Sequence, residues 1–173
     1  MQQLGEEQIF FECRNQAQQG QECYEKALSL VATHPAHAIK LFYQAYLTSS
    51  HYLTRLRLLN LPADITESNP PENLNLAGTL EEIFFRGLQI LNGLGVNRSY
   101  QSASAYFDYV IEVGIANNDM LFVPHAQLWK GMLYKFGRGV PHDEAIAAQW
   151  YRKAAEQRFA KAERNLGVCF ELG

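Results

Sequence analysis

The sequence predicts an all-α chain of stacked antiparallel helix pairs, and the first of two observations behind this prediction is a repeat. Small and aromatic residues of one segment return 36 positions later in the next. The pairs are Ala126 and Ala162, Gly131 and Gly167, Tyr134 and Phe170, and Gly137 and Gly173. A fixed period between about 20 and 50 residues is typical of proteins whose structural units stack on one another.

The second observation is the pattern within one period, which predicts two helices joined by a tight turn. Residues 137–141, Gly-Arg-Gly-Val-Pro, interrupt the helix because glycine adopts backbone angles closed to other residues and proline cannot continue a helix interior. Asp143 is a good N-cap for the next helix, since its carboxylate can accept hydrogen bonds from first-turn amides. An apolar stripe at helical spacing follows, made of Ala147, Trp150, Tyr151, Ala154 and Ala155.

Residues 126–155 carry the pattern A-x-x-x-x-G-x-x-Y-x-x-G-x-G-V-x-x-D-x-x-x-A-x-x-W-Y-x-K-A-A. At these positions the sequence resembles the Sel-one-like repeat (SLR), a relative of the tetratricopeptide repeat (TPR). The resemblance implies a right-handed α-α superhelix of antiparallel helix pairs. It also implies a protein-interaction scaffold with no catalytic activity and, because the family is commonest in bacteria, a bacterial origin.

The composition sets limits on the class of protein. With 173 residues the chain fits one compact domain or a short solenoid, and 47% apolar residues are enough for a core. A net charge of −3 and a pI of about 5.9 give no indication of a nucleic-acid or anionic-membrane partner. No cofactor is expected, because the Gly-x-Gly pairs follow predicted helices, whereas a dinucleotide-binding loop follows a strand.

The cysteines and the N-terminus bear on the cellular compartment. Cys13, Cys23 and Cys169 are an odd number without a C-x-x-C pair, which predicts reduced thiols. Some secreted SLR proteins link their repeats by cysteine pairs, but Leu133 stands at the position of Cys169 in the other copy. Residues 1–7 lack the features of a signal peptide, and no run of 18 apolar residues predicts a membrane span. We therefore expect a cytoplasmic protein, or a secreted effector without a cleavable signal.

Residues 1–60 are expected to form an N-terminal cap or divergent repeat, followed by a linker at 61–78. The expected helices are 6–19 ending at Gly20, 21–33, and a third from Pro35 to about Leu59. In the linker, three prolines and Gly78 exclude a helix. Loops of this length are usually functional or flexible.

Residues 79–173 are expected to form two repeats and a half-repeat, at 79–121, 122–158 and 159–173. The first opens with a capping box at Thr79–Glu82, and its Gly87 matches Gly131 at an offset of 44. Ser99 stands at the N-cap position of its second helix. The eight additional residues of this copy lie near 115–124, as a longer second helix or loop.

A strip of large residues on the first helices is the candidate partner-binding site. Arg86 and Lys130 stand where the SLR pattern has leucine, as in Leu166, and a basic group is costly to bury unpaired. Two alternatives follow: the neighbouring side chains fill the core, or they line an exposed groove on the inner face of the superhelix, where aromatic anchors beside a cation bind partners. The set is Phe84, Phe85, Arg86, Leu88, Leu128, Trp129, Lys130 and Met132.

No catalytic or metal site is expected. His34 and His37 lack a third ligand, and His125 and His142 are expected to be solvated at helix ends. Acidic pairs at helix starts complement the helix dipole. The aromatic residues of the second helices are expected in the core; these are Tyr106, Tyr109, Trp150 and Tyr151.

The leading hypothesis for function is an adaptor that holds a peptide or helix of another protein in its concave groove. One alternative is an accessory or regulatory domain of an enzyme or secretion complex, with chemistry in the 61–78 loop or on a segment outside this sequence. The other is a self-associating structural subunit. The last predicted helix, residues 160–172, has the first-helix pattern with no second helix after it. It is therefore a half-repeat cap, packs on a second chain, or precedes further sequence.

Overall fold

The computed structural model describes residues 17–48 and 74–172, which form helices and turns and no strand. Their helices are α2 (Ala17–Leu30), α3 (Pro35–Thr48), α5 (Leu80–Asn92), α6 (Tyr100–Ala116), α7 (Val123–Phe136), α8 (Glu144–Ala155) and α9 (Ala160–Leu172). The all-α prediction is confirmed. None of the helices in these ranges combines the length and the apolar character that crossing a lipid bilayer requires.

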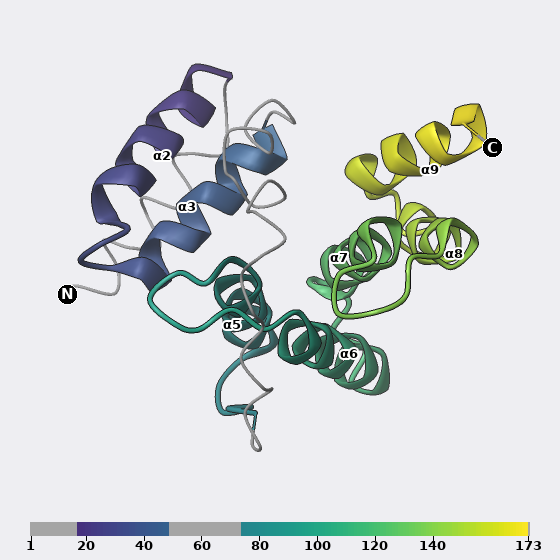
Figure 1. Cartoon of the computed structure of the whole chain (residues 1–173), viewed down its shortest axis with the longest axis horizontal. Helices are drawn as coiled ribbons and strands as arrows, with labels where there is room; N and C mark the ends of the chain where they lie inside the picture. The colour runs from purple at the N-terminus through teal and green to yellow at the C-terminus, as the bar shows by residue number, and fades with distance from the viewer. Residues whose placement is uncertain (1–16, 49–73, 173) are drawn as a thin grey trace.

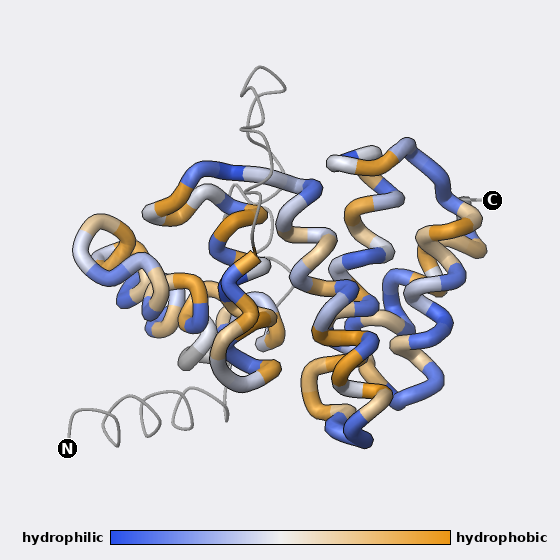
Figure 2. The backbone as a smooth tube through the Cα atoms, turned by 90° about the horizontal axis from the view of Figure 1, so that it is seen from below, coloured by the Kyte–Doolittle hydropathy of each residue, from blue (hydrophilic) through white to orange (hydrophobic). Residues whose placement is uncertain are grey.

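Helices that follow one another in the chain pack together, α2 on α3, α5 on α6, α7 on α8, and α9 on α8. Figure 1 shows them as one bent row from the N-terminal pair, past α5 and α6, to α9 at the other end. Orange and blue segments alternate along the helices in Figure 2, so each helix has an apolar side to bury. One core of buried residues runs from α3 to α9.

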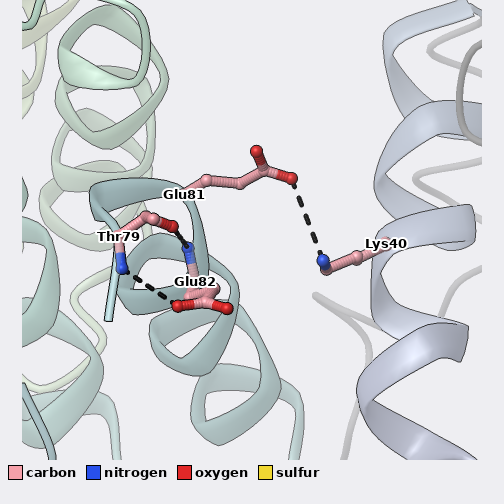
Figure 3. Close-up of polar contacts among 4 residues, drawn as sticks. All are labelled: Lys40, Thr79, Glu81 and Glu82. Carbon is pink, nitrogen blue, oxygen red and sulfur yellow. Dashed lines mark hydrogen bonds and ion pairs between the residues drawn. The ribbon is translucent and has the colours of Figure 1, made fainter. Parts of the chain in front are cut away.

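Side-chain caps fix where the helices begin, as the sequence predicts. At α5, the Thr79 hydroxyl accepts a hydrogen bond from the Glu82 amide at 3.2 Å, and the Thr79 amide donates to the Glu82 carboxylate at 2.9 Å (Figure 3). Ser99 caps α6, and Asp143 caps α8 by accepting from the Ile146 amide at 2.9 Å. These bonds satisfy first-turn amides that have no partner within the helix.

Glycines in the left-handed conformation end the two first helices, as the turn pattern predicts. Gly93 after α5 has φ 65° and Gly137 after α7 has φ 60°. Glycine carries no Cβ, so this conformation costs it little. The α6 helix has 17 residues against 12 in α8, so a longer second helix takes up part of the eight additional residues.

Gly87 and Gly131 lie in equivalent layers, each under an aromatic ring of the next helix. A Cβ atom on Gly87 would lie 2.9 Å from Cε1 of Phe107, and one on Gly131 would lie 2.5 Å from Cε1 of Tyr151. Both distances are shorter than carbon atoms tolerate, so only glycine allows these rings to come so close. The second helix of each repeat is thereby held against the first.

The N-terminal region differs from the prediction in its helix boundaries. Gly20 does not end a helix but lies inside α2, where it is buried. It can do so because glycine weakens a helix interior without breaking it. Most of the predicted helix 6–19, residues 49–59 of the predicted third helix, and linker residues 61–73 lie outside the described residues. Residues 74–79 are not helical, as expected for the end of the linker.

Cys23 is a further correction, because it is disulfide-bonded although the cysteine count predicts reduced thiols. Its side chain is buried between α2 and α3 with Ala27, Ala38 and Phe42. The predicted thiol at Cys13 lies outside the described residues. Cys169 is a free thiol, half-buried on α9.

Candidate protein-binding surface

The sides of α5 and α7 that face α3 carry a cluster of aromatic residues, which we call the inner face. The Tyr43 ring lies 5.3 Å from that of Phe84 and 5.8 Å from that of Phe85, both on α5. On α7, the Trp129 ring lies 5.9 Å from that of Tyr46 and 6.3 Å from that of Tyr43. Since α3 and α7 are far apart in the sequence, this contact is a tertiary one.

His125 on α7 belongs to the same cluster, which corrects the expectation that it is solvated. A hydrogen bond of 2.6 Å joins its Nδ1 to the Tyr43 hydroxyl on α3. Its ring also lies 5.2 Å from the Phe122 ring and 4.4 Å from the Phe159 ring. His125 thus connects α3 to the turn that precedes α9.

The predicted partner-binding strip belongs to the core and not to an open groove. Seven of its eight side chains are buried, with exposures between 0% and 5%: Phe84, Phe85, Leu88, Leu128, Trp129, Lys130 and Met132. Arg86 is half-buried. The burial favours the first of the two alternatives, in which these residues fill the space left by the absent leucines. In this structure the strip does not line an exposed groove, because Tyr43 and Tyr46 of α3 lie against its aromatic residues.

The two basic residues are accommodated in different ways. Lys130 is 5% exposed, and its Nζ lies 2.9 Å from the Asp108 carboxylate and 2.8 Å from the Ser104 hydroxyl, both on α6. The Trp150 ring, at 5.7 Å, covers the same ammonium group. Arg86 instead donates hydrogen bonds to backbone carbonyls of the segment before α5, at Asn75 and Ala77. Each cation therefore has the partners that burial requires.

Three tyrosines of the core have pKa values that burial raises. Burial raises the pKa of Tyr43 well above its ordinary value, and the neighbouring Tyr46 adds to this. Burial also raises the pKa values of Tyr46 and Tyr151. On α9, partial burial and the nearby Arg164 lower the pKa of Lys161, whose ammonium lies 4.9 Å from the Tyr46 ring centroid. Tyr46 of α3 thus contacts both α7, through Trp129, and α9, through Lys161.

The outer face of α9, which carries Gly167 and Phe170, is exposed, in contrast to this packed interior. Gly167 is exposed, and a Cβ atom placed on it would meet no heavy atom of the described residues within 4 Å. Phe170 on the same helix is 65% exposed. The helix does bury its other side, where Ala162 is 0% exposed and Leu166 packs against the core. Among the helices that the structure describes, none lies over this face at Gly167.

Sequence reasoning missed that α3 covers the inner face. A signal for it was present, because α3 is apolar nearly all the way round. Its buried residues are Ala38, Ile39, Leu41, Phe42, Tyr43, Gln44, Ala45 and Tyr46. A helix with this pattern is packed on more than one side. One side of α3 faces α2, and the other faces α5 and α7.

Side chains that could together hold a metal ion do not come together in the part of the chain that the structure describes. No cluster of three histidine, cysteine, aspartate or glutamate residues suited to a metal ion occurs there. His34 is exposed at the start of α3. The aromatic residues of the second helices are core, as predicted: Tyr106 and Tyr151 are buried, and Tyr109 and Trp150 pack against them.

The fold and the surface define a class of protein, an all-α chain of helix-pair repeats whose layers are set by glycine–aromatic contacts. Residues 124–159 match the family model of the Sel1 repeat. The chain therefore carries a Sel1 repeat, which is a TPR-like helical repeat, and the resemblance is confirmed. Sel1 repeats generally mediate protein–protein interaction and are typically non-enzymatic. No curated protein and no solved structure matches the chain.

Proposed function

We propose that the chain is a non-enzymatic protein-interaction module that binds a helix of another protein on the outer face of α9. The observations that support this proposal are the Sel1 repeat at residues 124–159 and the exposure of Phe170, at 65%, on the same side of α9 as the exposed Gly167. An exposed aromatic side chain on such a face is the kind of residue that anchors a partner.

The concave groove is a weaker place for this function. Its walls would be Phe84, Phe85 and Trp129, which are buried beneath Tyr43 and Tyr46. A partner could reach them only after α3 moved away, exposing aromatic surface at a cost in free energy. We therefore place the proposed site on α9, where Phe170 is exposed.

A bacterial source and a cytoplasmic setting stay predictions from the sequence. The disulfide at Cys23 weighs against the cytoplasm, because disulfides persist mainly in oxidising compartments. The secreted effector is therefore the favoured member of the pair that the sequence left open.

Affinity purification from the source cells, with the full chain as bait, tests the function. We expect one protein to be retained and then to bind the purified chain in a saturable manner. The same preparation should show no activity in a broad hydrolase screen. A chain that retains no partner, or that turns over a substrate, would contradict the proposal.

A further inference from the structure

Helix α3 contacts the same repeat position on each of the first helices α5, α7 and α9. Glu81, His125 and Lys161 share this position, because the copies are offset by 44 and then by 36 residues. Their partners on α3 stand three residues apart, so they lie along one side of that helix. These partners are Lys40, Tyr43 and Tyr46. The three contacts can therefore be compared directly.

The contacts on α5 and α7 satisfy the polar group at this position. Glu81 of α5 forms an ion pair with Lys40, with 3.8 Å between Oε1 and Nζ (Figure 3). His125 of α7 shares a hydrogen bond of 2.6 Å with the Tyr43 hydroxyl. At both places α3 supplies a group that complements the one on the first helix.

The contact on α9 leaves a positive charge without a carboxylate. The Lys161 ammonium lies 4.9 Å from the centroid of the Tyr46 ring, which attracts a cation without neutralising its charge. Lys161 is half-buried, and no aspartate or glutamate of the described residues forms an ion pair with it. Removing a charge from water is costly unless a counter-ion accompanies it. An anion beside Lys161 would therefore be stabilised.

Arg164 adds a second positive charge one turn further along α9. Partial burial lowers the pKa of Lys161, and the charge of Arg164 lowers it further. The equivalent residues on the other first helices are Phe84 and Leu128, both buried in the core. Among these three helices, α9 alone has an exposed cation at this position. The α9 end of the α3 contact is thus the positively charged one.

We propose that Lys161 and Arg164 form a binding site for a carboxylate of an acidic segment of another protein. A carboxylate accepts hydrogen bonds from ammonium and guanidinium groups alike. The whole chain has a net charge of −3, so an acidic segment is attracted only where local cations outweigh that charge. This site goes beyond the proposed function, because it lies where α9 meets α3 and does not involve Phe170.

The probe is an acetylated hexapeptide of glutamate, titrated into the full chain by isothermal titration calorimetry. In about 0.1 M salt, charges more than about 10 Å apart are largely screened, so only cations near the peptide contribute. We expect saturable binding of this peptide and no binding of the glutamine hexapeptide, which has the same size without the charges. Inorganic phosphate is titrated separately, and tighter binding of phosphate would overturn the carboxylate assignment.

Two variants locate the site. Lys161→Met removes the charge, keeps an apolar side chain against the Tyr46 ring, and should weaken binding of the glutamate peptide by about tenfold or more. The matched control is Lys26→Met, the same substitution at an exposed lysine of α2. It changes the net charge by the same amount and should leave binding unchanged. Equal binding by the two variants, or no binding by the native chain, overturns the site.

Thermal melting tests whether the chain itself already provides the counter-ion. Lys161→Met should leave the melting temperature unchanged or raise it, because it removes a partly buried charge that no carboxylate of the described residues neutralises. Methionine also retains a favourable contact with an aromatic ring. A clearly lower melting temperature would show that Lys161 is already paired within the chain, and this result would also overturn the site.

Discussion

Gly131 and Gly167 hold the same position of the repeat, so one substitution, glycine to alanine, gives opposite results at the two sites. At Gly167 the added methyl group enters open space. Alanine is about 1 kcal/mol more favourable than glycine within a helix. Gly167→Ala should therefore raise the free energy of unfolding by about 0.5–1 kcal/mol, the lower value applying near a helix end.

At Gly131 the same methyl group meets a ring. Its carbon would lie 2.5 Å from Cε1 and 2.7 Å from Cδ1 of Tyr151, which is 0% exposed. Forcing extra volume into a packed core costs about 1–3 kcal/mol, and a fully buried ring has little room to move, so the upper half of this range applies. After the gain of about 1 kcal/mol in helix propensity, Gly131→Ala should lower the free energy of unfolding by about 1–2 kcal/mol.

Urea denaturation and thermal melting of the two variants measure the difference. For a chain of this size, 1 kcal/mol corresponds to a change of about 2–4 °C in melting temperature. Gly87→Ala is the control for a glycine that lies under an aromatic ring, because its methyl carbon would lie 2.9 Å from Phe107. The reasoning is refuted if Gly131→Ala and Gly167→Ala shift stability in the same direction by similar amounts.

Three further predictions follow from the packing. Trp129→Ala should lower the free energy of unfolding, measured in urea, by about 3–5 kcal/mol, because the Trp129 side chain is buried in the core. Phe170→Ala should change it by less than about 0.5 kcal/mol, because Phe170 is exposed. Equal effects of the two variants would contradict this difference in burial. Asp108→Ala should lower the free energy of unfolding by about 1–3 kcal/mol, because it leaves the buried Lys130 ammonium without its carboxylate; the loss is moderate because Asp108 is 45% exposed. Lys130→Met, which removes the buried charge itself, should change the free energy of unfolding little. A larger loss for Lys130→Met than for Asp108→Ala would argue against the ion pair. The three buried tyrosines, Tyr43, Tyr46 and Tyr151, have raised pKa values and keep their protons above about pH 10, where the same tyrosines in the unfolded chain lose theirs. The unfolded state then binds fewer protons than the folded state. The free energy of unfolding therefore falls as the pH rises, by about 1.4 kcal/mol per tyrosine and pH unit. Urea midpoints between about pH 10 and 12 measure this fall, and a flat profile would show that these hydroxyls are not buried.

The local features of this chain could be read from the sequence because they depend on neighbours within a few residues. The caps at Thr79, Ser99 and Asp143 and the turn after Gly137 satisfy or reshape backbone groups of their own segment. The repeat added the class of fold, since each amphipathic helix pair must bury its apolar side against a copy of itself. The core role of Tyr106 and Tyr151 follows from the same periodicity.

The candidate site could not be read in this way. The residues around Phe85 and Trp129 suit a groove wall or a core equally well, and only their contact with Tyr43 and Tyr46 of α3 decides between the two. These contacts join α3 to α5 and to the more distant α7, and no periodicity encodes them.

The sequence by itself determined the helix pairs, their caps and their repeat, because these arise from short-range spacing and backbone chemistry. Only the tertiary structure decided which faces are covered. Gly131 and Gly167 have the same place in the pattern, yet one lies under a buried ring and the other faces open space. Burial depends on which helix comes to lie against a face, and the pattern of that face alone does not contain this information.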